Sequence, residues 1–124
     1  VSLVALRGQV DNLPPLLAQA AVVVIPSEAE GIPLIALEAF AMERPVVSSR
    51  VGAAAEVVRQ HTGVLIAPGG TKAARFAQAL AELLAAPGRR REMGKAGRRL
   101  VEAEYGRERA RTAYRSLLRE VVTV

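Results

Sequence analysis

Residues 22–41 read VVVIPSEAEGIPLIALEAFA, an apolar run followed by a short polar loop and a second apolar run. The three valines and the isoleucine that open the stretch are apolar on both faces, as expected of a parallel strand covered on both sides. Pro26 ends this strand, and the spacing predicts a helix over about residues 33–42. The stretch therefore predicts one strand-loop-helix unit of an α/β domain.

The same alternation extends in both directions along the chain. We expect strands over residues 2–6, 22–25, 46–48 and 64–67, and helices over residues 13–20, 33–42, 53–59, 72–86, 89–104 and 107–122. This order predicts an α/β fold, a Rossmann-like three-layer α/β/α sandwich with a mostly parallel sheet of about four strands. Phe76, Met93, Tyr105 and Tyr114 fall at helical spacing, and we expect them in the core.

The length of 124 residues is that of one domain. We expect residues 1–124 to form a single domain, of which residues 88–124 are basic C-terminal helices. No apolar run approaches the ~20 residues that cross a bilayer, and no signal peptide is visible, so we expect a cytoplasmic protein. Because the chain begins at Val1, we also expect it to be either a processed product or a piece of a longer protein.

The composition excludes several kinds of site. The absence of cysteine rules out disulfides and thiolate metal sites, and the single histidine, His61, leaves no histidine cluster for a metal or a catalytic triad. The sequence also lacks the glycine-rich patterns of dinucleotide-binding and P-loop proteins. Aromatic residues make up only 3%, which argues against base stacking and hence against a nucleic-acid partner.

The loop after residues 22–25 is the richest candidate for a site, because parallel α/β sheets bind ligands beyond the carboxyl ends of their strands. Glu28, Glu30 and Gly31 stand directly before a helix, whose free amides and dipole can hold an anionic or polar ligand. Glutamate oxygens would accept from ligand hydroxyls while the amides receive phosphate. The alternative is structural: the carboxylates favour the helix N-terminus through its dipole, and Gly31 eases the turn.

A longer motif surrounds this loop. It comprises Pro26-Ser27, Glu30, Gly31-Ile32-Pro33-Leu34 and Glu38-Ala39-Phe40-Ala41, followed by Pro45-Val46-Val47, Gly52 and Glu56. This string, with seven residues between two glutamates, resembles the donor-site signature of the family 4, or group 1, glycosyltransferases of GT-B fold. The resemblance covers nearly the whole chain. It implies the last part of that family's C-terminal, nucleotide-sugar-binding domain.

The resemblance implies a role for each matching position. Glu30 would be catalytic and meet hydroxyls of the donor sugar near the reacting centre, and Glu38 would accept hydrogen bonds from the ribose. The implied donor-binding residues are Glu30, Gly31, Ile32, Pro33, Leu34 and Glu38. The implied reaction transfers a sugar from a nucleotide diphosphate sugar to an acceptor hydroxyl, with retention at the anomeric carbon and without a metal ion or other cofactor.

Two positions depart from the family's pattern. Glu43 stands where the family usually has a glycine, and Ala53 replaces the second glycine of a pair that begins at Gly52. If Glu43 adopts a positive φ, the turn bears strain of about 1 kcal/mol, which a fold tolerates. Ala53 bears on donor affinity if the second glycine lets the backbone approach phosphate.

The resemblance also implies parts that this sequence does not contain: an N-terminal acceptor domain with a catalytic histidine, the first strands of the donor domain, and basic side chains for the diphosphate. Missing strands would separate residues 2–6 from residues 22–25, and we expect this gap to favour a homo-oligomer formed by strand exchange. Two functions therefore stay open. One is the donor-site part of a retaining glycosyltransferase, inactive in isolation, and the other is a non-catalytic Rossmann-like interaction or oligomerisation module.

The net charge of +5 comes from the C-terminal part of the chain. Residues 88–124 hold 11 basic and 5 acidic side chains, whereas residues 1–87 hold 6 and 7. These basic residues form either a solvated face, partly paired with neighbouring glutamates, or a surface that meets anionic lipid. The second alternative predicts a protein that is peripheral to the membrane.

Overall fold

The centre of the structure, a computed structural model that describes residues 3–122, is a sheet of three parallel strands. β1 (Val23–Ile25), β2 (Val46–Ser49) and β3 (Gly63–Ile66) lie side by side in chain order. Parallel neighbours require a crossover, and a helix supplies each one. The predicted strands over residues 22–25, 46–48 and 64–67 are thus confirmed to within about one residue at each end.

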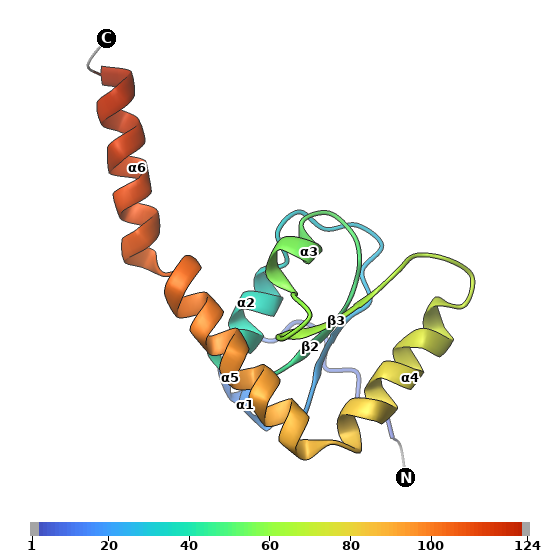
Figure 1. The fold of residues 1–124 in the computed structure, drawn as a ribbon. Helices are drawn as coiled ribbons and strands as arrows, with labels where there is room; N and C mark the ends of the chain where they lie inside the picture. The colour runs from blue at the N-terminus through green and yellow to red at the C-terminus, as the bar shows by residue number, and fades with distance from the viewer. Residues whose placement is uncertain (1–2, 123–124) are drawn as a thin grey trace.

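Helices cover both faces of the sheet, as Figure 1 shows. α1 (Pro14–Gln19), α2 (Leu34–Ala41) and α3 (Ala54–Val57) belong to one side, and α4 (Lys72–Leu84) packs on the other. α5 (Pro87–Glu104) passes beneath the amino ends of the strands, and α6 (Arg107–Val122) projects from the body. The predicted Rossmann-like α/β/α arrangement is therefore present, with three strands instead of four.

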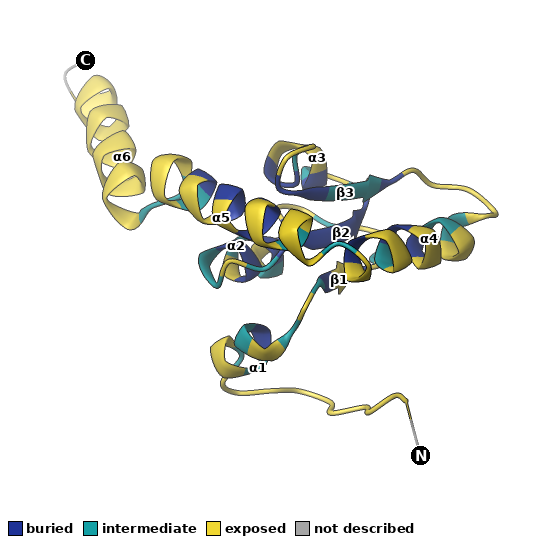
Figure 2. Ribbon diagram, turned by 60° about the horizontal axis from the view of Figure 1, so that its bottom comes forward, coloured by how far each residue is buried: buried dark blue, intermediate teal, exposed yellow. Residues whose placement is uncertain are grey.

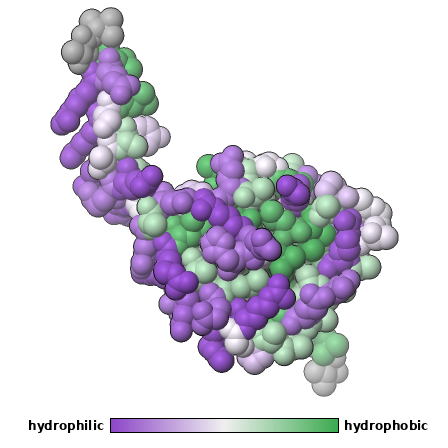
Figure 3. All heavy atoms as spheres, viewed as in Figure 1, coloured by the Kyte–Doolittle hydropathy of each residue, from purple (hydrophilic) through white to green (hydrophobic). Residues whose placement is uncertain are grey.

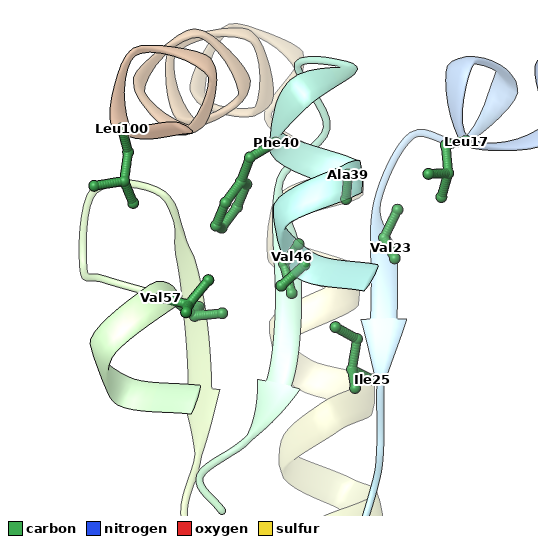
Figure 4. Packing of buried hydrophobic residues seen from close by; sticks show 10 residues of the cluster. Leu17, Val23, Ile25, Ala39, Phe40, Val46, Val57 and Leu100 are labelled. Carbon is green, nitrogen blue, oxygen red and sulfur yellow. The ribbon is translucent and has the colours of Figure 1, made fainter. Parts of the chain in front are cut away.

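Two apolar clusters fill the space between the layers. The cluster under α2 gathers Phe40, Val46, Val57 and Leu100, and Figure 4 shows these side chains converging from four elements. The cluster under α4 gathers Val47, Ile66, Phe76, Leu83 and Met93. Because successive side chains of a strand point to opposite faces, the adjacent Val46 and Val47 serve different clusters. β2 is buried on both faces, as a central parallel strand should be.

The predicted strand over residues 2–6 is wrong. Residues 3–6 have no regular secondary structure, and the side chains of Leu3 and Leu6 are 97% and 96% exposed. The remaining residue of the prediction, Ser2, lies outside the described residues. A strand is held by a hydrogen-bonded neighbour and a covering layer, and a run of apolar residues alone does not supply either.

The C-terminal helices differ from the prediction in two ways. α5 begins at Pro87 instead of after the Pro87-Gly88 pair, because proline is tolerated in the first turn of a helix. Tyr114 is 69% exposed on α6 and not in the core, whereas Phe76 and Met93 are buried as predicted. Figure 2 shows α6 exposed along its whole length, and Figure 3 shows apolar residues along one of its sides. Between residues 3 and 122, no helix combines the length and apolarity needed to cross a membrane.

Candidate donor site

The loop of residues 26–33 joins β1 to α2 at the carboxyl edge of the sheet, where the sequence predicts the site. Within it, the Ser27 hydroxyl donates a hydrogen bond of 2.7 Å to Glu30 Oε1. Glu30 is half-buried, so this bond fixes one carboxylate oxygen and leaves the other available. The sequence does not single out Ser27 for this contact, and a serine three residues before Glu30 is its only signal.

The first turn of α2 is ready to receive polar groups. Pro33 is the N-cap, and no described side chain caps this helix end. Proline has no N–H, so the available donors come from the residues on either side of Pro33. Ile32 and Leu34 are 54% and 66% exposed, which places large apolar side chains beside these amides at the surface.

Glu38 lies on the second turn of α2 and is exposed. The structure therefore carries the six predicted donor-binding residues on one continuous loop and the helix that follows it. Five of them, from Glu30 to Leu34, belong to the loop and the helix start. Glu38 stands one turn further along.

Gly52 packs against the loop of residues 26–33 and helps to fix its position. Its φ is 53°, and a side chain built on it would overlap the carbonyl oxygen of Glu30. The next residue, Ala53, donates its backbone N–H to Gly31 O at 3.1 Å and has an ordinary φ of −86°. The loop after β2 thus supports the loop after β1, and the Ala53 amide is already engaged by protein.

Glu43 adopts the strained conformation that its position predicted. Its φ is 56°, the left-handed region in which glycine is favoured. The Glu43 carbonyl packs against Gly94 of α5, where a side chain would collide with it. The strain lies at the amino end of β2, whereas the candidate site lies at the opposite, carboxyl ends of the strands.

Lys72 is a second residue that the sequence reasoning missed. From the first turn of α4, its Nζ donates to Pro26 O at 3.3 Å and to Glu28 Oε1 at 3.2 Å. These bonds tie α4 to the start of the loop of residues 26–33, which we call the donor loop after its predicted role. The signal in the sequence is a lysine directly after Pro68-Gly69-Gly70-Thr71, the turn that follows the last strand.

The arrangement offers oriented carboxylate oxygens next to free helix amides. This combination suits a ligand that carries both hydroxyls and an anionic group. Within residues 3–122, no three His, Cys, Asp or Glu side chains come close enough together to hold a metal ion.

Comparison with known proteins identifies the family. The model of the family described as "Glycosyl transferases group 1" matches residues 2–86. A mannosyltransferase of Corynebacterium glutamicum, named as GDP-mannose-dependent and acting on a monoacylated phosphatidylinositol monomannoside, is 40% identical over 81 residues. That match covers 65% of this chain and 21% of the relative. The chain therefore belongs to the group 1 glycosyl transferases.

Solved structures agree. Sucrose-phosphate synthase from Thermosynechococcus elongatus has a TM-score of 0.83 and 34% identity, over 90% of this chain and 28% of its own. The C-terminal domain of a group 1 glycosyl transferase (LpcC) from Francisella tularensis has a TM-score of 0.70 and 26% identity, over 84% of this chain and 53% of its own. The chain thus spans about a fifth of the mannosyltransferase's length and about half of the Francisella domain.

Proposed function

We propose that this chain is the donor-site portion of a retaining glycosyltransferase, which transfers a sugar from a nucleotide diphosphate sugar to an acceptor hydroxyl. The observation that carries the proposal is the support of Glu30. Ser27 holds its carboxylate and Gly52 packs against its carbonyl, directly before the uncapped start of α2. Membership of the group 1 family supports sugar transfer as the reaction class.

Each group has a defined part in this proposal. The free oxygen of Glu30 accepts hydrogen bonds from the donor sugar, and Glu38 accepts from the ribose. The backbone of residues 31–34 faces the diphosphate, whose charge the α2 dipole favours. Nothing in these roles requires a metal ion or other cofactor.

We propose further that the isolated chain binds donor without turning it over. Departure of a nucleoside diphosphate develops negative charge, which several positive groups must stabilise. The donor loop offers helix amides but carries no basic side chain of its own. A further, N-terminal domain would supply the acceptor site and the remaining catalytic groups.

Titration calorimetry with UDP-, GDP- and ADP-sugars tests this function. We expect saturable binding of one nucleotide class, weakened about tenfold or more in Glu38→Ala, because a hydrogen bond to a charged acceptor is lost. Glu120→Ala, an exposed carboxylate on α6, is the matched control and should bind like the parent chain. Absence of binding by all three classes, or equal weakening by both variants, would contradict the proposal.

A second candidate, a non-catalytic interaction module, is supported by α6. Tyr114, Leu117, Leu118 and Val121 are each more than half exposed, although their spacing is that of a packing face. Arg107, Arg111 and Arg115 follow one another at four-residue intervals on the same helix. An apolar stripe flanked by arginines suits the surface of an anionic membrane, which would make this protein peripheral to the bilayer in the cytoplasm.

Vesicle sedimentation separates this candidate from the first. Binding to vesicles with anionic lipid should fall steeply with salt and with Leu117→Asp, and vesicles of neutral lipid should bind little. If no protein sediments with anionic vesicles at low salt, binding to a membrane surface is excluded.

Strand exchange between copies is a further form of the interaction module. β1 is an edge strand of the described sheet, and the side chains of Leu3 and Leu6 are exposed in the same chain. An open edge invites an extended segment from a second copy. Light scattering should then show a dimer that Leu3→Pro weakens, and a strictly monomeric parent chain would count against exchange.

A further inference from the structure

A polar pocket lies beside the donor loop, at the carboxyl ends of β2 and β3. It has a volume of about 330 Å³ and is lined by Ser49, Arg50, Gly69, Lys72 and Glu28, among others. These residues come from the end of β2, the turn after β3, the start of α4 and the donor loop. The pocket therefore gathers residues from four separate parts of the chain, and three of these parts contribute a charged side chain: Glu28, Arg50 and Lys72.

Ser49 points to a ligand in this pocket. The residue is 0% exposed, and its Oγ has no hydrogen-bond partner within the described structure. Ser49 follows Val47 by two positions, so its side chain lies on the α4 face of the sheet, the face from which Lys72 and Gly69 approach. A buried hydroxyl without a partner is costly, and a ligand that bonds it would remove the cost.

The start of α4 accumulates positive charge. Its first turn carries Lys72 and Arg75 and no acidic residue, and no described side chain caps its N-terminus at Thr71. Cations are unfavourable at this end of a helix, because the dipole is already positive there. Arg75 Nη2 lies beside Gly69, and Arg75 Nε is buried without a partner among the described residues. An anion bound in the pocket would compensate the charge of Lys72 and the positive end of the α4 dipole.

Two cations retain bonding capacity toward the pocket. Lys72 Nζ has three donors, of which Pro26 O and Glu28 Oε1 take two. The Arg50 side chain forms no ion pair within residues 3–122. Glu28 opposes anion binding, but its side chain is 94% exposed and free to turn away. The positive groups therefore outnumber the single acidic one.

The geometry points to an oxyanion site: Ser49, Arg50, Lys72 and the start of α4 bind a phosphate or carboxylate group that is separate from the donor diphosphate. Val51 lines this pocket, and the adjacent Gly52 packs against the Glu30 carbonyl of the donor loop. An anion held in the pocket would therefore lie next to a donor sugar bound at Glu30. An anionic substituent of the acceptor is one source of such a group, and free phosphate is the other.

An NMR titration of the full chain with inorganic phosphate, at ionic strength held constant with chloride, tests the site. We expect saturable shifts of the amides of Ser49, Arg50 and residues 69–72, and a higher Tm in phosphate. Lys72→Ala and Arg50→Ala should each weaken binding about tenfold, whereas Lys95→Ala, an equal charge loss on the exposed face of α5, should not. Malate and glycerol 3-phosphate, tested in parallel, distinguish an acceptor substituent, which should bind more tightly than phosphate, from phosphate itself.

Two variants have effects of opposite sign. Glu28→Gln should strengthen phosphate binding, because it removes the opposing charge and releases Lys72. Ser49→Ala should weaken binding about threefold or more and leave the Tm unchanged or raised, since the deleted hydroxyl is unpartnered. A purely structural Ser49 would instead lower the Tm without changing binding, which would overturn its role.

The site is independent of the proposed donor function, and Glu38→Ala distinguishes the two. In that variant, binding of nucleotide sugar should be lost, and binding of phosphate should be unchanged. Displacement of phosphate by a nucleotide sugar would show that the pocket is the donor's own phosphate site, and shifts spread evenly over all basic residues would show that no site exists. Either result would overturn the inference.

Discussion

α5 and α6 follow one another in the chain, are similar in length and share an arginine-rich composition, yet they behave differently. α5 buries Met93, Gly94, Ala96, Gly97 and Leu100 against the rest of the domain. α6 buries none of its described residues, although its apolar side chains are larger. Gly97 shows why, because a side chain there would run into the ring of Phe40. Small residues let α5 approach α2 closely, and large apolar residues alone did not secure burial for α6.

Two arginines of α5 bond to the ends of neighbouring helices. On α5, Arg98 donates to Ala41 O at the end of α2 and to Glu102, and Arg90 donates to Leu83 O and Leu84 O at the end of α4. These side chains satisfy carbonyls that helix ends leave open, and their charge suits that end of the dipole. Part of the basic face that the sequence predicts is therefore structural.

Shortening a leucine on each helix should give the largest contrast. Leu100→Ala removes a side chain that is 7% exposed and should lower the free energy of unfolding by about 3 kcal/mol. Leu117→Ala removes one that is 54% exposed and should change it by less than about 0.5 kcal/mol. Urea unfolding followed by circular dichroism measures both. Equal losses would mean that α6 is packed in solution.

Adding a methyl group to α5 sharpens the comparison from the opposite direction. Gly94→Ala places a Cβ against the Glu43 carbonyl and should cost about 2 kcal/mol through overpacking. Gly88→Ala, where nothing lies within 4 Å, is the control and should stabilise by about 0.5 kcal/mol. If Gly94→Ala were as stable as its control, the close contact between α5 and the α2–β2 turn would be disproved.

Acidification should remove the stability that an ion pair at the C-terminal end of α5 contributes. Glu104 bonds Arg59 at 2.6 Å, and this bond lowers the pKa of Glu104 below its ordinary value of 4.5, while the pKa of Arg59 is raised by the same partner. A lowered folded-state pKa contributes stability above the unfolded-state value, and that contribution is lost as the pH falls through the folded-state pKa. Thermal unfolding at a series of pH values should therefore show a Tm deficit for Glu104→Gln near neutrality that vanishes in acid.

Arg59→Gln provides the partner control for this pH effect. It should reproduce the deficit of Glu104→Gln, and the double variant should add nothing further. Additive deficits would mean that the two side chains act separately.

Removing α6 should have the smallest effect. In a chain ending at Gly106, the described residues that are lost, 107–122, are all exposed in the folded protein, so the free energy of unfolding should stay within about 0.5 kcal/mol of the full chain. Urea unfolding of the two chains measures the difference. A large loss would show that α6 packs on the domain or on a second copy.

The sequence predicts most of this fold because its signals are local. The apolar run of residues 22–25, Pro26 and the glycine-flanked turns mark strand ends directly, and Gly52 marks a place where a side chain does not fit. Residues 3–6 and Tyr114 were predicted wrongly because their burial depends on a neighbour that local pattern does not specify. The same reason applies at the site. The motif indicates Glu30 and Glu38, whereas Ser27 and Lys72 are recognised only once the chain brings them to their partners.

The hydrogen bond from Ala53 to Gly31 also has a kinetic meaning. The Ala53 amide can exchange its hydrogen with water only when the loop after β2 separates from the donor loop. Its exchange rate therefore reports how often the donor loop opens, at a residue that touches no ligand in the proposed site. A nucleotide sugar that closes the loop should slow this one amide, and mass spectrometry of deuterium uptake would record the closure without any label on the sugar.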